Sequence, residues 1–330
     1  MEYRDLGRTG LSVSLLGFGC GNVGGLLVRG TPAERERAVA RAVELGVNYF
    51  DTAPLYWDGR SEEHLGQVLR ALRPDVYVGT KVRLAPAELG DVPAAIARSL
   101  EVSLGRLGLE RVDLLQLHNP ILAAPGGRGV PVATVLDAVV PALVRLREQG
   151  KLRFLGVTAL GETGAVHRAL EAGGLHTAQV CYNLLNPTAG AAVPPGFPAH
   201  DFGGLLARAR GHGVGVIVIR ALAGGALSGT LERHPVAVPT VEPIASGPDY
   251  ATDVARARRL DVLVREGHAA SVVEAALRFA AAGPGVSTVL VGCSSLQQLE
   301  AAAAALARGP LPPPALDRLA EAWRGFATRP

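Results

Sequence analysis

Eight short apolar runs, separated by segments with helical periodicity, are the feature that most restricts how this chain can fold. The runs are rich in β-branched residues and apolar at nearly every position, which is typical of parallel strands covered on both faces. These predicted strands are residues 15–18, 47–51, 76–81, 112–118, 152–158, 177–182, 213–220 and 287–292.

The segments between the runs carry helix-capping signals. A Ser or Thr followed three residues later by Glu or Gln has the spacing of a capping box. This spacing occurs at Thr31 and Glu34, Ser271 and Glu274, and Ser294 and Gln297. Eight strand–helix units without an interdomain linker predict an α/β fold, the closed (β/α)8 or TIM barrel, as one domain over residues 1–330. An open doubly wound sheet is the alternative, because one miscounted strand would permit it.

Two further features flank the alternation. The start of the chain has the pattern of a β-hairpin that turns at residues 8–10, before the first barrel strand. Three stretches rich in Pro, Gly and Ala, residues 123–131, 191–201 and 231–246, follow strands and fit neither a helix nor a strand. Loops of this length are usually functional in a compact barrel, and the topology would place all three at the C-terminal mouth.

Composition and spacing exclude several classes of protein. The net charge of +3 is small and the Arg residues are interspersed with acidic ones, so no nucleic-acid surface is predicted. No stretch is apolar enough for a membrane helix or an export signal. Cys20, Cys181 and Cys293 are far apart, which favours a reducing cytoplasm. The eight His residues lack H-x-H and H-E-x-x-H spacings, so no metal is expected, and the oligomeric state stays open.

Polar residues stand at the ends of three successive predicted strands. Asp51, Lys81 and His118 close the second, third and fourth runs, and Tyr56 follows Asp51 in a loop. Each has an ordinary explanation alone: a turn-starting Asp, a solvated Lys, a packing His and a loop-anchoring Tyr. Together they predict a buried charged cluster, which is costly unless it is fully paired or used.

The chemistry of these four residue types suggests a proton donor. A phenol with a pKa near ~10 is a weak acid at neutral pH, and a neighbouring ammonium lowers that pKa by stabilising the phenolate. We therefore expect Asp51 to position Lys81, and Lys81 to tune Tyr56 toward physiological pH. His118 would orient a carbonyl oxygen against the phenol.

Five segments carry a resemblance to a known family. They are FDTAPLYWDGRSEEHLG (50–66), GTK (79–81), RLGLERVDLLQLHNP (106–120), LREQGKLRFLGVT (146–158) and QVCYNLLN (179–186). In order and spacing they resemble the aldo-keto reductase superfamily across nearly the whole chain. The resemblance implies a catalytic tetrad of Asp51, Tyr56, Lys81 and His118, with Tyr56 as general acid in reduction and general base in oxidation.

The resemblance also implies a nicotinamide dinucleotide, bound extended across the mouth without a Rossmann fold. NADP(H) is the expected cofactor and NAD(H) the alternative, because a basic residue that the family carries near Ser295 is missing here. Trp57 and His118 are the implied substrate contacts. The implied cofactor contacts are Gly19, Cys20, Gly21, Asp51, Thr158, Gln179, Ile219, Arg220, Leu222, Gly292, Ser294, Ser295 and Gln298.

Two positions near the nicotinamide depart from the family pattern. Ala159 stands where an Asn is usual, and Ile219 replaces an aromatic residue that stacks on nicotinamide. Arg220 follows, and either a phosphate contact or an ion pair at the strand end would explain it.

The resulting expectation is an NAD(P)-dependent oxidoreductase acting on an aldehyde, ketone or aldose, or on the corresponding alcohol. A nucleotide-binding regulatory protein of the same fold with little turnover is the alternative.

Overall fold

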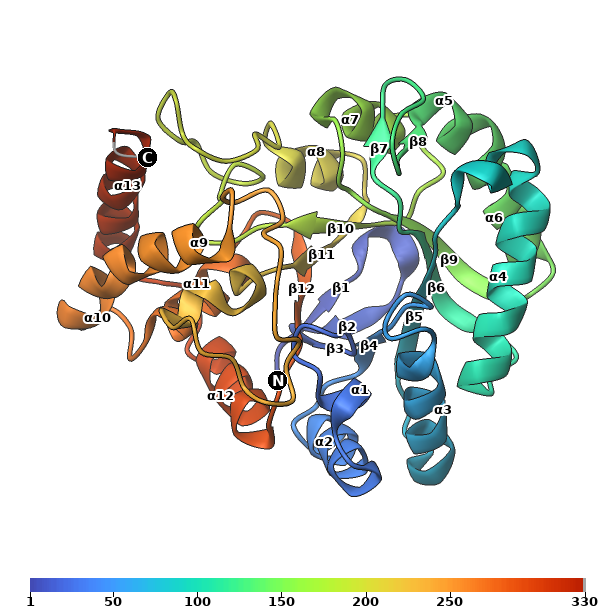
Figure 1. Cartoon of the computed structure of the whole chain (residues 1–330), viewed down its shortest axis with the longest axis horizontal. Coiled ribbons are helices and arrows are strands. Elements are labelled where there is room, and N and C mark those ends of the chain that lie inside the picture. The colour runs from blue at the N-terminus through green and yellow to red at the C-terminus, as the bar shows by residue number, and fades with distance from the viewer. Residues whose placement is uncertain (329–330) are drawn as a thin grey trace.

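A closed barrel of eight parallel strands forms the centre of the computed structural model, which describes residues 1–328 (Figure 1). The barrel order is β10-β11-β12-β3-β4-β5-β6-β9. The strands are β3 (Leu16–Gly19), β4 (Tyr49–Asp51), β5 (Tyr77–Val82), β6 (Val112–Leu117), β9 (Leu152–Thr158), β10 (Thr177–Cys181), β11 (Gly215–Ile219) and β12 (Val286–Val291). Because β12 pairs with β3, the sheet closes, which confirms the predicted barrel and excludes the open sheet. Residues 329–330 of the expected domain lie outside the described residues.

Helices surround the barrel and follow each of its strands. They are α2 (Pro32–Glu44), α3 (Arg60–Leu72), α4 (Val92–Leu107), α6 (Val140–Glu148), α7 (Thr163–Glu171), α8 (Leu205–Gly211), α11 (Val272–Ala281) and α12 (Leu296–Ala307). Further α-helices are α1 (Leu26–Arg29), α5 (Val132–Thr134), α9 (Tyr250–Arg258), α10 (Val262–Arg265) and α13 (Pro313–Thr328). The short 3-10 helices are η1 (Gly7–Thr9), η2 (Pro86–Gly90), η4 (Ala223–Ser228) and η5 (Arg259–Asp261), and η3 (Val135–Val139) is a short π-helix. Among residues 1–328 no helix combines the length and the apolar character needed to cross a membrane.

The helix starts largely follow the capping signals. The Thr31 hydroxyl accepts the Glu34 N–H, and the Glu34 carboxylate accepts the Thr31 N–H, as a capping box requires. Ser271 caps α11 in the predicted way. The third prediction is wrong by one residue: Ser295, not Ser294, is the N-cap of α12. The reason is that β12 and the loop after it keep Ser294 in contact with the neighbouring backbone, where its hydroxyl donates to the Gly24 carbonyl.

The predicted hairpin closes the N-terminal end of the barrel. β1 (Tyr3–Asp5) pairs with β2 (Ser12–Ser14), and η1 makes the turn between them. A small core cluster unites buried hairpin side chains with side chains from inside the barrel. Its buried members are Leu6, Leu11, Val13, Tyr49, Leu114 and Ile217. The barrel interior therefore has a packed floor, and a ligand can enter the interior from the opposite end.

Inside the barrel, apolar side chains give way to polar ones toward the C-terminal ends of the strands. Residues two apart on a strand share a face, so Asp51 follows Tyr49 on the inner face of β4. Gln116 follows Leu114 on β6 in the same way. β4 and β6 thus each contribute one residue to the floor and a polar residue to the mouth.

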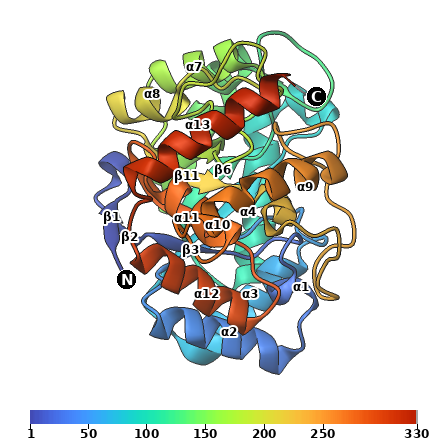
Figure 2. The same cartoon turned by 90° about the vertical axis from the view of Figure 1, so that its left-hand side faces the viewer.

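Residues 231–246, which we call the clasp segment, join η4 to α9 without a helix or strand of their own. The segment reaches the loop after β3, where the Val238 N–H donates to the Asn22 carbonyl at 3.2 Å. In Figures 1 and 2 this gold-coloured chain runs down toward α1. Since β12 lies between β11 and β3 in the barrel, the clasp segment bridges two loops at the mouth.

The other two long stretches also lie after strands. Residues 123–129 form a turn between the short strands β7 (Ile121–Leu122) and β8 (Val130–Pro131), and residues 191–201 contain no regular element. Figure 2 shows α13 on the outside of the barrel. It is fixed there by the Trp323 indole N–H, which donates to the Leu184 carbonyl at 2.9 Å.

Candidate active site

A buried ion pair occupies the mouth of the barrel. Asp51 is the last residue of β4 and Lys81 lies near the end of β5, and their side chains are 4% and 1% exposed. The Lys81 ammonium donates to the Asp51 carboxylate, to the Thr52 carbonyl at 2.9 Å and to the Tyr56 hydroxyl at 3.3 Å. The structure therefore brings three of the four predicted tetrad residues into one hydrogen-bonded group.

The loop after β4 carries Tyr56 back over the strand ends. It reverses through three left-handed residues, Trp57, Asp58 and Gly59, whose φ angles are 51°, 51° and 86°. The Tyr56 ring packs against Gly21, where an added Cβ would lie 3.4 Å from the phenol Cζ. Gly21 thus forms part of the wall against which the ring packs.

His118, the fourth residue, directly follows β6. Its ring meets the Tyr56 ring edge-on, with centroids 5.9 Å apart. Burial, with the nearby cations of Lys81 and Arg83, lowers the pKa of His118 to about 3. The imidazole is therefore neutral at physiological pH, and its buried Nδ1 has no hydrogen-bond partner among the described residues.

The prediction that the Tyr56 pKa is lowered is wrong. Burial raises the pKa of Tyr56 above its usual value, and the Lys81 ammonium only partly opposes this effect. Burial alone would lower the pKa of Lys81, but Asp51 and Tyr56 hold that pKa above its ordinary value. The resting site thus contains a protonated phenol beside a charged ammonium.

Asp51 is held by more donors than the sequence indicated. Three side chains donate to Asp51 Oδ1: the Gln179 amide at 2.7 Å, the Tyr49 hydroxyl at 3.3 Å and the Gln116 amide at 3.4 Å. Gln179 was predicted as a cofactor contact, whereas Tyr49 and Gln116 were missed. The alternation along each strand is the signal that would have found them, since both lie on the inner face of the barrel.

An unpartnered hydroxyl lies next to Gln179. Thr158 ends β9, and the two residues are register partners of adjacent strands. The Thr158 Oγ1 is buried without a hydrogen-bond partner in residues 1–328. A hydroxyl and an amide side by side fit a ligand that both donates and accepts, as a carboxamide does. Ala159 is fully buried and contributes no such group.

The glycine-rich loop after β3 comes close to the end of β12. The Cys20 N–H donates to the Asp51 carbonyl at 2.9 Å, and Gly19 ends β3 beside it. Burial is the main reason that the pKa of the Cys20 thiol is raised, so this thiol is unreactive. A Cβ on Gly24 would lie 2.3 Å from the Gly292 carbonyl carbon, so these two backbones meet where no side chain fits.

Arg220 is a strained cation at the tip of β11. It follows Ile219, the last residue of the strand, and its φ of 56° is left-handed. Its guanidinium donates to the Glu242 carbonyl at 3.3 Å and makes no ion pair with any of the described residues. Burial lowers the pKa of Arg220. No ion pair at the strand end explains this residue within residues 1–328, and its role as a phosphate contact stays a prediction. Leu222 lies two residues further on, just before η4.

The polar groups at the start of α12 largely satisfy one another. The Ser294 N–H donates to Gln298 Oε1 at 2.7 Å, and the Ser295 hydroxyl accepts the Gln298 N–H at 3.3 Å. These three residues were predicted to meet the adenosine end of the cofactor. They lie together, and none of them carries a positive charge.

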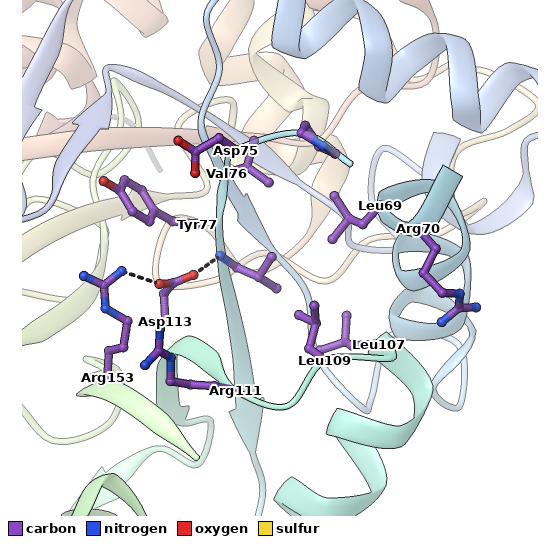
Figure 3. A pocket seen from close by; sticks show the side chains of 12 residues that line it. Leu69, Arg70, Asp75, Val76, Tyr77, Leu107, Leu109, Arg111, Asp113 and Arg153 are labelled. Atoms are coloured by element: carbon purple, nitrogen blue, oxygen red, sulfur yellow. Dashed lines mark hydrogen bonds and ion pairs between the residues drawn. The ribbon is translucent and has the colours of Figure 1, made fainter. Parts of the chain in front are cut away.

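A pocket of about 360 Å³ lies at the opposite, N-terminal end of the barrel (Figure 3). It lies beside the starts of β5, β6 and β9. There Asp113 accepts from the Arg153 guanidinium at 2.8 Å and from the Val78 N–H at 2.8 Å. None of the tetrad residues lines it. Within the described part of the chain, no group of three or more His, Cys, Asp or Glu side chains could hold a metal ion.

Comparison with known proteins identifies the family. The model of the Aldo/keto reductase family matches residues 15–324. L-galactose dehydrogenase of Arabidopsis thaliana is 29% identical, over 93% of this chain and 88% of that protein. A probable voltage-gated potassium channel subunit beta, also of Arabidopsis thaliana, is 26% identical over 100% of this chain and 99% of its own length.

A solved structure gives the same result. The aldo-keto reductase AKR11C1 from Bacillus halodurans, in its holo form, superimposes with a TM-score of 0.73 and 26% identity. The match covers 98% of this chain and 96% of that one. With its closed barrel, its buried Asp–Lys–Tyr group and the family match over nearly its whole length, the chain belongs to the aldo/keto reductase family.

Proposed function

We propose that this protein transfers a hydride between a nicotinamide dinucleotide and the carbonyl or alcohol carbon of a small molecule, with Tyr56 giving or taking the proton. The supporting observation is the Lys81 ammonium, which contacts both the Asp51 carboxylate and the Tyr56 phenol inside a barrel with a packed floor. Membership of a nicotinamide-using family and the presence of dehydrogenases among the relatives support the same reaction class.

The chain's own residues account for the proton transfer. A phenol with a raised pKa is fully protonated at neutral pH, so Tyr56 can donate as negative charge develops on a carbonyl oxygen. The Lys81 ammonium then stabilises the phenolate that remains, and Asp51 keeps that ammonium in place. Neutral His118, beside the phenol ring, can donate one hydrogen bond to the same oxygen.

The residues at the mouth fit a nicotinamide dinucleotide. The Thr158 hydroxyl and the Gln179 amide would bind the carboxamide, and Arg220 would bind a phosphate. Gly19, Cys20, Gly21, Leu222, Gly292 and the Ser294, Ser295 and Gln298 group line the rest of the proposed path. The nicotinamide ring supplies or accepts the hydride. Ile219 would contact that ring with an aliphatic surface in place of an aromatic one.

NADP(H) is the proposed cofactor, and NAD(H) is the alternative. Arg220 supplies a cation for the dinucleotide phosphates, but Ser295 leaves the adenosine end without one. The substrate is proposed to be an aldehyde, ketone or aldose. Trp57, 37% exposed beside Tyr56, would contact it. We treat residues 1–330 as one catalytic domain, and three free, buried cysteines suit the reducing cytoplasm.

A turnover assay tests this proposal. The purified protein should oxidise NADPH in the presence of a small aldehyde, as followed by the loss of NADPH absorbance. The similarity to a potassium channel subunit over the full chain keeps a regulatory, nucleotide-binding role as the second candidate. Tight nucleotide binding without turnover of any aldehyde, ketone or aldose would favour that role. Absence of nucleotide binding would exclude both.

A further inference from the structure

One guanidinium joins the clasp segment to the loop that carries Tyr56. Arg29 ends α1, and its Nη1 donates to the Ala237 carbonyl at 2.5 Å and approaches the Val236 carbonyl at 3.4 Å. Both carbonyls belong to the clasp segment. The Cζ atom of the same guanidinium lies 5.0 Å from the centroid of the Trp57 ring. Arg29 therefore contacts two mouth loops that are far apart in the sequence.

Trp57 needs external support for its conformation. Its φ of 51° is left-handed, which is unfavourable for a bulky residue, and Asp58 repeats the same value. A second guanidinium also lies near the ring, since the Arg60 Cζ is 5.6 Å from its centroid. Cation–π contacts of this kind stabilise an otherwise strained and exposed ring. The two cations differ in one respect: Arg29 also holds the clasp segment, whereas Arg60 has no such contact among the described residues.

A second arginine fixes the clasp segment internally and to the loop after β3. Arg233 donates to the Val238 carbonyl at 2.6 Å, to the Gly224 carbonyl at 2.8 Å and to the Val23 carbonyl at 3.2 Å. These bonds set the position of the segment without reaching Trp57. A displacement of the clasp segment would thus move Arg29 and change its contact with the Trp57 ring.

We propose that Arg29 is a positioning residue that couples closure of the clasp segment over the dinucleotide to the conformation of Trp57 at the substrate side of the mouth. This inference rests on the proposed function. The proposed cofactor path runs from Arg220 to the loop after β3, and the clasp segment bridges these same two places, so we take it to lie over the bound dinucleotide. When the segment is closed, its two carbonyls hold the guanidinium against the indole, and the strained loop keeps Tyr56 beside Lys81. Coupling of this kind is reciprocal, so a change at Trp57 must alter nucleotide affinity even without substrate.

A double-mutant cycle on nucleotide affinity measures the coupling. Dissociation constants for NADP+ are determined by titration calorimetry for the wild type, Arg29→Ala, Trp57→Ala and the double variant. We expect Arg29→Ala to weaken NADP+ binding about tenfold and Trp57→Ala about threefold, with no further loss in the double variant. Arg60→Ala is the matched control. It removes the other cation from the indole and should leave NADP+ affinity unchanged while raising KM for an aldehyde.

A second readout follows the indole itself. The chain has two Trp residues, so Trp323→Phe leaves Trp57 as the only one. In that background NADP+ should change the Trp57 emission, and Arg29→Met, which keeps the length of the side chain, should abolish the change. Thermal unfolding of each variant shows whether the fold is intact.

The outcomes are distinguishable. Additive losses in the cycle, or an equal loss of NADP+ affinity in Arg60→Ala, would overturn the coupling while leaving the oxidoreductase proposal intact. Failure of the wild type to bind NADP+ or NAD+ would instead overturn the proposed function on which the coupling rests.

Discussion

The two ends of the barrel each carry an Asp paired with a cation, in opposite surroundings. At the mouth, Asp51 and Lys81 are 4% and 1% exposed, and Asp51 accepts from three further side chains. At the N-terminal end, Asp113 and Arg153 are 17% and 35% exposed and line the pocket in Figure 3. A buried pair is costly and hydrophobic replacements are often as stable, whereas an exposed pair costs and contributes little. This difference in burial favours a chemical role for the pair at the mouth and a local structural role for the pair at the N-terminal end.

Removing one hydroxyl at each end gives the largest expected contrast. Tyr56→Phe should lower kcat/KM for aldehyde reduction by about a hundredfold to ten-thousandfold, because it removes the proton donor and little volume. NADP+ affinity should be nearly unchanged. Tyr77→Phe, at the start of β5 beside the opposite pocket, is the control and should retain full activity. Steady-state kinetics decide, and an active Tyr56→Phe enzyme would remove Tyr56 from its proposed role.

The same Asp-to-Asn change at each end should differ strongly in stability. Asp51→Asn leaves the Lys81 ammonium buried without its counter-ion, so we expect a loss of about 3 to 5 kcal/mol in the free energy of unfolding. Asp113→Asn breaks a partly exposed pair and should cost about 0.2 to 1 kcal/mol. Urea unfolding measures both. Equal losses at the two ends would show that burial does not distinguish the pairs.

The pH dependence tests how strongly burial acts on the mouth. Reduction requires protonated Tyr56, whose pKa is raised, so kcat/KM should stay flat to about pH 10 and fall only above it. Oxidation requires the phenolate and should therefore rise about tenfold per pH unit below that pKa. Because the pKa of His118 is about 3, its protonation should not limit the rate near neutrality. If kcat/KM for reduction instead falls just above about pH 7, the effect of Lys81 on the Tyr56 pKa outweighs the effect of burial.

Adding a charge at the mouth gives the smallest expected effect. Ser295→Arg should increase the preference for NADPH over NADH about tenfold, since one charge-assisted hydrogen bond to a phosphate contributes about 1.5 to 3 kcal/mol. Val102→Arg adds the same charge on α4, where the side chain is 51% exposed, and should leave the preference unchanged. Dissociation constants for both nucleotides are compared. An identical ratio in all three proteins would place the adenosine end elsewhere.

The barrel and the grouping of the tetrad could be predicted because both depend on order along the chain. Asp51, Lys81 and His118 end successive strands, and parallel strands bring such ends together. The direction of the pKa of Tyr56 could not be predicted in this way. It depends on how completely the finished fold excludes water from the phenol, and no local pattern records that. Ser295 became the N-cap for a similar reason, since a tertiary contact of Ser294 decided between neighbouring serines.

Contacts between distant loops were the least accessible to sequence reasoning. The composition of residues 231–246 predicts a loop at the mouth. Nothing in that composition specifies that the carbonyls of the loop accept hydrogen bonds from Arg29. The donors to Asp51 are an intermediate case. The strand period places Gln116 and Tyr49 on the inner face, but only the closed barrel brings them within hydrogen-bonding distance.

The floor of the barrel has a consequence for how the chain is made. The Arg8 N–H donates to the Gly213 carbonyl, and the Arg4 guanidinium donates to the carbonyls of Ala281 and Val286. The first hairpin therefore cannot form these hydrogen bonds until the ribosome has synthesised more than two hundred further residues. Until then Leu6 and Val13 lack Ile217 of their cluster, and the nascent chain depends on its later strands, or on a chaperone, to keep these side chains from other partners.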